Sequence, residues 1–275
     1  MEQALHFEQE CDALDALLCQ LEPGDWEQKT AFKDWTINDI MVHLYFWNQM
    51  AAWSIFDPET FGPQMDRVMA NIQRHGMRST ENDWIEERGG DLHRAWSQHY
   101  RSVGPKWRDQ DPKKRVRWAG PDMSIRSSVT ARQMETWAHA QAIFDVFGMD
   151  RAESDRLYNI VMLGFNTFGW THKVRGWPIP AAAPELRLIA PSGLEWRMGD
   201  ANDQDWICGA AVDFARVVTQ TRHVADTALE VHGDIAKGWM QHAQCFAGAA
   251  QEPPPPGSRY KKMKGSMDDP RTQTP

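Results

Sequence analysis

The chain has 275 residues, enough for one large or two ordinary domains, so its core needs neither disulfides nor a metal for stability. Its formal net charge is -8 and its basic residues are mostly scattered, which argues against a nucleic-acid partner. The first ten residues are acidic where a secretory signal would be basic and then apolar, and no apolar run is long enough to span a membrane. We therefore expect a cytoplasmic protein.

Cysteine and tryptophan usage narrows the class of protein further. The four cysteines, at positions 11, 19, 208 and 245, show no CxxC spacing and no electropositive context, so we expect reduced and inert thiols. The 14 tryptophans either fill the core or line an aromatic pocket, and the sequence leaves both possibilities open.

Helical patterns run through residues 1–175, which we predict to be one all-α domain. Apolar residues recur at helical spacing over residues 3–22. Thr36 and Asp39 are spaced as a capping box for a helix from about Ile37 to Trp53. Further helices are predicted over residues 64–75, 80–108, 125–147 and 152–173, the one at 125–147 being closed by Gly148.

A second, smaller α/β domain is predicted over residues 184–248, after a proline-rich connector. Apolar and polar residues alternate around a Pro-Ser-Gly turn at 191–193, which is typical of a hairpin. We predict a helix over 205–220, a strand over 229–231 and a helix over 236–247. Residues 249–275 are proline-rich and then polar and basic, so we expect a flexible tail. The predicted fold class is α+β.

Glu135 and His139 form the most informative pair in the sequence. Residues four apart on a helix lie one turn apart on the same face, so both side chains can address one point. His43 lies on the apolar, inward stripe of the predicted helix 37–53, so its imidazole should face the interior. Two imidazoles and one carboxylate are a familiar set of ligands for a divalent metal.

Spacing alone does not establish a metal site. Glu2 and His6 have the same spacing near the N-terminus, where no site is expected. From the pattern, a buried Glu–His pair without a metal remains an open alternative for Glu135 and His139.

Several segments carry a resemblance to a known family. They are DWTINDIMVHLYFWNQMAAW (34–53), RVRWAGPDMSIRSSVTARQMETWAHAQAIFDVFG (115–148) and, in the second domain, LRLIAPSGLEWRMGD, GAAVDFARVVTQTRHVADTAL and HGDIAKGWMQHAQCFAG. Together they resemble the DinB-like superfamily, and more closely the mycothiol-dependent maleylpyruvate isomerase family with its uncharacterised metal-binding relatives. The resemblance covers about residues 5–248.

The resemblance implies an N-terminal up-and-down four-helix bundle that binds a divalent ion, most often zinc, through His43, Glu135 and His139. It also implies a low-molecular-weight thiol, mycothiol or glutathione, that the metal activates for attack on an electrophilic small molecule, in an isomerase or thiol S-transferase reaction. We expect no nucleic-acid or membrane partner, and a monomer or homodimer.

This chain departs from the family at two positions. Relatives often carry an aspartate three residues after the second metal histidine and another five after the first, where this chain has Ala142 and Asn48. A changed substrate or reaction is therefore expected. Two alternatives stay open: a metal-dependent hydrolase or lyase that uses metal-bound water, and a non-catalytic metal- or ligand-binding protein.

Three further residues are candidates for substrate binding. Arg132 lies one turn from Glu135, and Arg222 lies in a segment where relatives are also basic. Either guanidinium could hold a carboxylate of the substrate or thiol, or could instead form a structural salt bridge. Trp47 shares the inward stripe of His43 and is the third candidate.

Overall fold

The computed structural model describes residues 1–261, which fall into two compact units that divide between Ala140 and Gln141. The first unit is helical and the second contains a mixed sheet with helices, which confirms the predicted α+β fold class. The predicted domain limits at residues 175 and 184 stay a prediction. Among the described helices, none has the length and apolarity that crossing a lipid bilayer requires.

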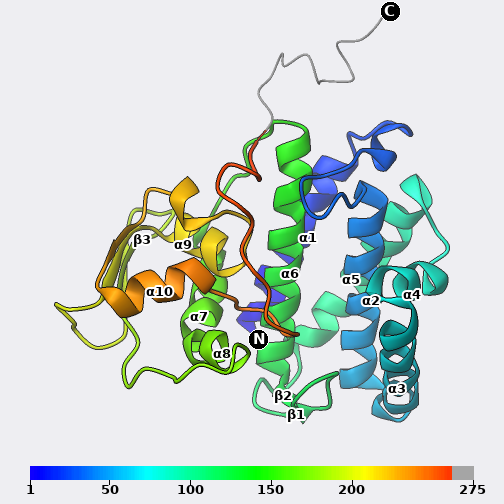
Figure 1. The fold of residues 1–275 in the computed structure, drawn as a ribbon. Coiled ribbons are helices and arrows are strands. Elements are labelled where there is room, and N and C mark those ends of the chain that lie inside the picture. The colour runs from blue at the N-terminus through cyan, green and yellow to red at the C-terminus, as the bar shows by residue number, and fades with distance from the viewer. Residues whose placement is uncertain (262–275) are drawn as a thin grey trace, which may run out of the picture. The chain divides into compact units, whose positions relative to one another are not determined.

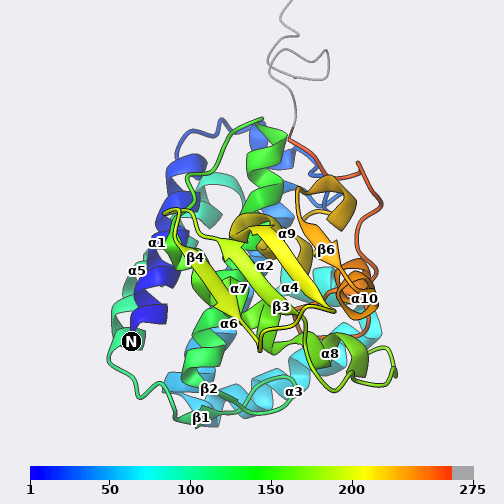
Figure 2. The ribbon, with the colours of Figure 1, turned by 90° about the vertical axis from the view of Figure 1, so that its left-hand side faces the viewer.

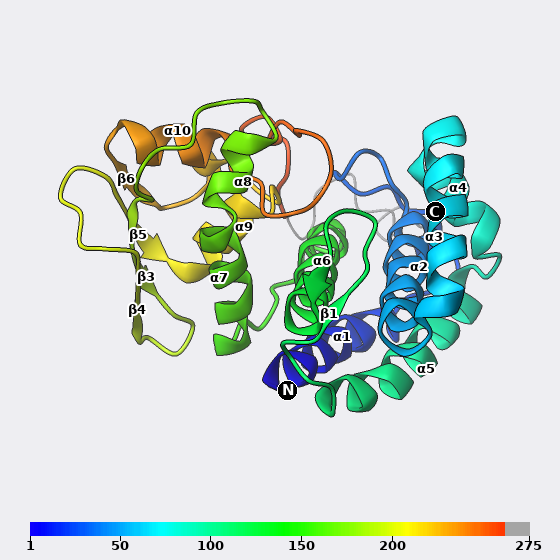
Figure 3. The same ribbon diagram turned by 90° about the horizontal axis from the view of Figure 1, so that it is seen from below.

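Four long helices dominate the first unit, and they correspond to predicted helices. They are α1 (Glu2–Leu18), α2 (Ile37–Phe56), α5 (Gly89–Arg108) and the first part of α6 (Ile125–Val146). Figure 1 shows them as a bundle, and Figure 3 shows α2 beside α6 and α1 beside α5. The other elements of this unit are η1 (Asp25–Glu27), α3 (Pro58–His75), α4 (Met77–Trp84) and a small antiparallel pair, β1 (Arg115–Val116) and β2 (Met123–Ser124).

The predicted capping box sets the start of α2. The Asp39 backbone N–H donates to the Thr36 hydroxyl at 3.0 Å, and the Thr36 backbone N–H donates to the Asp39 carboxylate at 2.9 Å. This exchange satisfies two helix-terminal N–H groups and fixes where the helix begins. Because the start fixes which residues face inward, it directs His43 into the bundle.

The helix predicted over residues 80–108 is two helices, α4 and α5. Arg88 is extended, with φ of −139° and ψ of 160°, and Gly89 has a φ of 58°. Neither conformation continues an α-helix, so the chain turns here and α5 starts afresh. The break places α4 against α2, which matters for the site described below.

Polar and aromatic contacts hold α1 against α5 in antiparallel orientation. The Tyr100 hydroxyl donates to Asp12 at 2.8 Å, and the Arg108 Nε donates to Glu8 at 2.7 Å. The rings of Phe7 and Trp107 pack with their centroids 5.0 Å apart. Because these contacts are spread along both helices, the two helices form a fixed pair.

The second unit is built on a four-stranded mixed sheet in the order β4-β3-β5-β6 (Figure 2). The strands are β3 (Glu185–Ile189), β4 (Glu195–Met198), β5 (Trp206–Ala210) and β6 (Glu230–His232). The helical elements are η2 (Asp155–Leu157), α7 (Tyr158–Asn166), α8 (Phe168–Lys173), α9 (Ala211–Val218), η3 (Val224–Asp226) and α10 (Asp234–His242). The predicted hairpin is confirmed as the antiparallel pair β3–β4.

The helix predicted over residues 205–220 is wrong in its first half. Residues 206–210 form β5, which pairs parallel to β3 on one side and antiparallel to β6 on the other. The apolar spacing there suits a buried central strand as well as a helix, and the partner strands decide between them. Gly209, with a φ of 142°, would also interrupt a helix.

The predicted flexible tail lies partly outside the described residues, since residues 262–275 are not among them. Within residues 249–261, the Gln251 backbone N–H donates to Gln244 at 2.9 Å and the Gly257 N–H donates to Asp226 at 2.9 Å. Lys261 donates to Asp150 at 2.6 Å.

Glu185, on β3, is a buried carboxylate whose contacts give a testable pH dependence. It accepts hydrogen bonds from Arg187 at 2.6 Å, from Arg197 at 3.2 Å and from the Asn202 backbone N–H at 3.1 Å. The hydrogen bond from Arg187, then that from Asn202, lowers the pKa of Glu185 to about 2. A carboxylate with a lowered pKa stabilises the fold above its unfolded pKa, and this contribution is lost as the pH falls from about 4.5 towards 2.

We therefore expect Glu185→Gln to lower the free energy of unfolding by about 1–3 kcal/mol at neutral pH, and by progressively less as the pH falls below about 4.5. Urea unfolding of both proteins across this pH range measures the effect. The matched control is Glu195→Gln, because Glu195 is 45% exposed and pairs with the same Arg197. A difference between wild type and Glu185→Gln that does not change with pH would contradict the assignment.

Candidate metal centre

The three predicted ligands meet inside the first unit, where α2 faces α6. Glu135 Oε2 lies 3.4 Å from His43 Nε2 and 3.2 Å from His139 Nε2. The ligand atoms of all three residues lie within 4.8 Å of one another. His43 is 7% exposed and His139 8% exposed, whereas the Glu135 side chain is 21% exposed. The three side chains therefore converge on one point that is buried but still open to solvent.

Glu81 is a fourth residue of the site that the sequence did not indicate. It lies on α4, is fully buried, and its Oε1 is 2.8 Å from His43 Nδ1. The same oxygen accepts a hydrogen bond from Trp47 Nε1 at 2.7 Å. A carboxylate at Nδ1 fixes the tautomer of the imidazole, so that Nδ1 carries a proton and Nε2 points at the ligand position.

Aromatic rings surround the two histidines. The Trp35 ring stacks on His139 at 6.0 Å with an interplanar angle of 4°, and Phe32 meets His139 edge-on at 4.9 Å. Trp47 lies 6.3 Å from the His43 ring. Tryptophans elsewhere in the chain fill the core, since Trp96, Trp107, Trp137 and Trp239 are almost completely buried. Tryptophans therefore fill the core at several positions, and others lie against the two histidines.

Burial and neighbouring charges shift the pKa values of all three predicted ligands when no metal is bound. Burial alone lowers the pKa of His43, but the carboxylates of Glu81 and Glu135 outweigh burial and raise this pKa to about 9. For Glu135, burial raises the pKa, and hydrogen bonds from His139 and His43 together with the charge of Arg132 lower it well below its usual value. Burial lowers the pKa of His139, and the positive charge of His43 lowers it further.

Arg132 brings a buried positive charge next to this cluster. It is 5% exposed, and its Nη2 lies 4.0 Å from Glu135 Oε1. Its Nε and Nη1 have no hydrogen-bond partner among the residues that the structure describes. Burying N–H groups of a guanidinium without partners is costly, so a bound anion or ordered water is needed to satisfy them. Arg132 thus has N–H donors left to satisfy, and its role in substrate binding stays a prediction.

The other predicted substrate-binding residues lie in different surroundings. Trp47 is 8% exposed and donates to Glu81, as described above. Arg222, in the second unit, donates to Asp145 at 2.7 Å. Their contact with substrate stays a prediction. Asn48, one of the two departures from the family pattern, is fully buried and its backbone accepts a hydrogen bond from His99 of α5.

The residues at this site fit a divalent metal ion. Two imidazole nitrogens and one carboxylate oxygen converge, as in metal centres with three protein ligands and an open position. The second nitrogen of His43 is bound to a carboxylate, the arrangement that orients histidine ligands of metals. Among the described residues that converge here none offers sulfur, and nitrogen and oxygen donors of this kind suit zinc and similar ions.

The helical bundle is that of the DinB-like class of proteins, and a buried His/Glu/His set lies within it. The model of the mycothiol maleylpyruvate isomerase N-terminal domain matches residues 7–144, and the chain belongs to this family. An uncharacterised protein of Mycobacterium tuberculosis, found in strains CDC 1551 / Oshkosh and ATCC 25618 / H37Rv, is 30% identical over 248 residues. That match covers 90% of this chain and 94% of the relative.

Solved structures show the same fold. The structure is similar to crystal structures of the mycothiol-dependent maleylpyruvate isomerase and of a histidine-to-alanine mutant of that enzyme, with TM-scores of 0.50 and 0.51. Each match covers 78% of this chain and 87% of the other, at 13% and 14% sequence identity. At this level of identity the similarity shows the fold alone.

Proposed function

We propose that this protein is a zinc-dependent enzyme that uses a low-molecular-weight thiol, mycothiol or a related thiol such as glutathione, on an electrophilic small molecule. The observation that supports the proposal best is the convergence of His43, Glu135 and His139, with Glu81 bound to the second nitrogen of His43. A structurally similar enzyme is mycothiol-dependent by name. A divalent ion held by these residues would supply a thiolate at neutral pH by lowering the pKa of a coordinated thiol.

The charges of the site favour an anionic ligand. With a divalent ion present and both imidazoles neutral, the charges are the two of the ion, one positive charge of Arg132 and the two negative charges of Glu81 and Glu135. One positive charge is left over in a largely buried place. One bound anionic group, a thiolate or a carboxylate, balances it, and a buried charge that is balanced avoids most of its desolvation cost.

Arg132 indicates the class of substrate. A guanidinium with unpartnered Nε and Nη1 has N–H groups left to donate to an anionic group such as a carboxylate. The nearby rings of Phe32, Trp35 and Trp47 would exclude water from the reacting atoms. We therefore propose a substrate, or a thiol, that carries a carboxylate group.

Cobalt substitution tests the use of a thiol. Mycothiol added to the cobalt-loaded protein should produce sulfur-to-cobalt charge-transfer absorption, because its sulfur would join the nitrogen and oxygen ligands. The experiment uses the Cys19→Ser variant, so that no sulfur of the exposed Cys19 contributes. S-methylated mycothiol is the matched control, since it cannot become a thiolate.

Turnover distinguishes the proposed reaction from the alternatives. We expect conversion of carboxylated electrophiles, maleylpyruvate among them, to require the thiol and to be lost in His139→Ala. Conversion that proceeds unchanged without any thiol would favour a hydrolase or lyase that uses water. Absence of both the absorption change and any conversion would favour a non-catalytic binding protein.

A further inference from the structure

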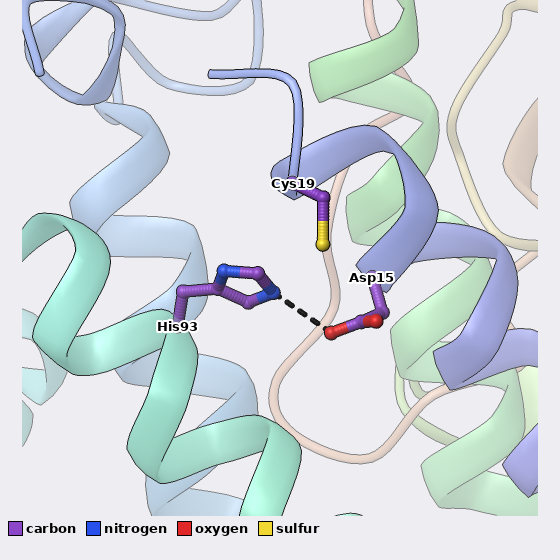
Figure 4. Close-up of side chains that lie close together, drawn as sticks. All are labelled: Asp15, Cys19 and His93. Carbon is purple, nitrogen blue, oxygen red and sulfur yellow. Dashed lines mark hydrogen bonds and ion pairs between the residues drawn. The ribbon is translucent and has the colours of Figure 1, made fainter. Parts of the chain in front are cut away.

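A second cluster of ligating side chains lies at the other side of the helical bundle, where α1 ends and α5 begins. Asp15 and Cys19 come from α1 and the residue that caps it, and His93 comes from the first turn and a half of α5. The carboxylate, the sulfur and an imidazole nitrogen all lie within 4.8 Å of one another. Figure 4 shows the three side chains pointing towards a common point. None of these residues belongs to the His43 site.

The cluster follows from helix geometry. Asp15 and Cys19 are four residues apart, so they lie on one face at the C-terminal end of α1. The antiparallel packing of α1 and α5 brings His93 opposite this face, with His93 Nε2 2.7 Å from Asp15 Oδ1. Arg101 donates to the other oxygen, Oδ2, at 2.9 Å and so holds the carboxylate in place. The donors are therefore fixed by the helix pair.

A plain salt-bridge network does not account for all three residues. It explains the contacts of Asp15 with His93 and Arg101, but it gives no reason for the position of Cys19, whose sulfur is turned towards the pair although the residue is exposed. Sulfur, nitrogen and oxygen atoms that meet at one point are typical of ligands for zinc and similar ions.

A cysteine nucleophile activated by His93 is also a poor match. That arrangement places the acid on one ring nitrogen and the thiol on the other. Here Asp15 bonds to Nε2, and in Figure 4 the sulfur lies on the same side of the ring as Nε2 while the other nitrogen faces away. Cys19 and Asp15 thus approach a single nitrogen, as they would around a shared ion.

We propose that Asp15, Cys19 and His93 form a second metal site, which binds zinc or a similar borderline divalent ion independently of the His43 site. The ligands are Asp15 Oδ1, Cys19 Sγ and His93 Nε2, and water completes the coordination on the exposed side. On binding, the Cys19 thiol releases its proton and the proton between His93 and Asp15 is displaced, because these ligands must be deprotonated. The ion would link the end of α1 to the start of α5.

Cobalt titration of the full-length His43→Ala/His139→Ala variant tests this site alone. We expect one cobalt ion per chain and a sulfur-to-cobalt charge-transfer absorption, which the nitrogen and oxygen ligands of the His43 site cannot produce without added thiol. Adding Cys19→Ser should abolish the absorption, and adding His93→Asn should weaken cobalt binding at least tenfold, by analogy with losses seen on altering metal-site residues. Cys208→Ser is the matched control, because Cys208 lies in β5 of the second unit.

Alkylation of the wild-type protein gives a second measurement that needs no variant. Zinc should slow the reaction of Cys19 with iodoacetamide, followed by mass spectrometry of its peptide, and should leave Cys208 unaffected. The proposal fails if cobalt absorption persists in Cys19→Ser, if the double variant binds no cobalt, or if zinc does not protect Cys19. Circular dichroism of each variant ensures that a loss of binding does not reflect unfolding.

Discussion

Replacing His139 with alanine is expected to abolish stoichiometric metal binding at the site between α2 and α6. The change removes one of the three ligands proposed among the described residues and leaves Glu135 with a single imidazole partner, His43. Because altering residues that merely support metal ligands costs about 10–100-fold in affinity, the loss of a ligand should exceed about a hundredfold. Metal analysis after dialysis, and competition with a zinc chelator, measure the loss.

The Cys19→Ser/His93→Asn background makes this measurement specific. It removes two of the three ligands of the second proposed site, so that the remaining ion is the one held between α2 and α6. His43→Ala should behave like His139→Ala, whereas His242→Ala should keep its metal, since His242 lies in the second unit and pairs with Glu252 at 3.4 Å. One ion per chain that survives in both His43→Ala and His139→Ala would show that these residues are not the ligands.

The sequence predicted the site in part because two of its elements are long and regular helices. Helical periodicity placed His43 on the inward face, and the capping box of Thr36 and Asp39 fixed where that helix begins. Spacing brought Glu135 and His139 to one face of α6. Periodicity could therefore bring together the residues of each helix, while the resemblance indicated that the two helices share one site.

The spacing of a glutamate and a histidine does not by itself indicate a metal site, as a pair near the N-terminus illustrates. Glu2 and His6 form a pair at 3.7 Å with the same spacing as Glu135 and His139, but Glu2 is 73% exposed. What differs between the two pairs is burial and the approach of a third ligand from another helix. Both are tertiary properties, and the pattern of a single helix does not contain them.

Contacts between segments that are distant in the chain could not be predicted from local sequence patterns for the same reason. Glu81 lies 38 residues from His43 in a stretch that was predicted to continue into a longer helix. The break before Gly89 separates α4 from α5, and α4 packs against α2. Likewise Cys19 was expected to be inert, because nothing near it in sequence indicates His93. The strand β5 was missed because its backbone pairs with β3 and β6, and this pairing cannot be seen in the sequence of β5 itself.

Glu81 also changes how the missing acids of the family pattern are interpreted. The chain has Ala142 and Asn48 where relatives often carry aspartates, which indicated a site poor in carboxylates. The structure places a buried carboxylate at the site nevertheless, from α4. One of its oxygens, Oε2, has no hydrogen-bond partner among the described residues, so the acid can still accept a hydrogen bond from a ligand.

Glu81→Gln is expected to separate two opposing effects of this carboxylate on metal binding. As the partner of His43 Nδ1, Glu81 orients the imidazole and makes it a stronger ligand, and losing such a partner costs about 10–100-fold in affinity. As a nearby charge, Glu81 helps to raise the pKa of His43 to about 9, so that at neutral pH a proton must leave before the metal can bind. The substitution weakens both effects.

The pH dependence of metal affinity reveals the balance between them. In the wild-type protein one proton leaves His43 on binding, so the affinity should rise about tenfold per pH unit up to about pH 9 and then level off. In Glu81→Gln the pKa of His43 is expected to be lower, so the metal affinity of this variant should level off at a lower pH. The loss of affinity should therefore be smaller at about pH 7 than at about pH 9.5, where it reaches the full 10–100-fold.

Trp47→Phe is the matched control, because it removes the other hydrogen bond to the same Glu81 oxygen and leaves the contact with His43 in place. Trp47→Phe should change neither the maximum metal affinity nor the pH at which the affinity levels off by more than a small amount. Titration of the His43 imidazole by NMR in the metal-free proteins gives a readout that does not depend on metal at all. If the His43 pKa is unchanged in Glu81→Gln, the carboxylate does not control the protonation of this ligand, and the expected difference between the two pH values should vanish with it.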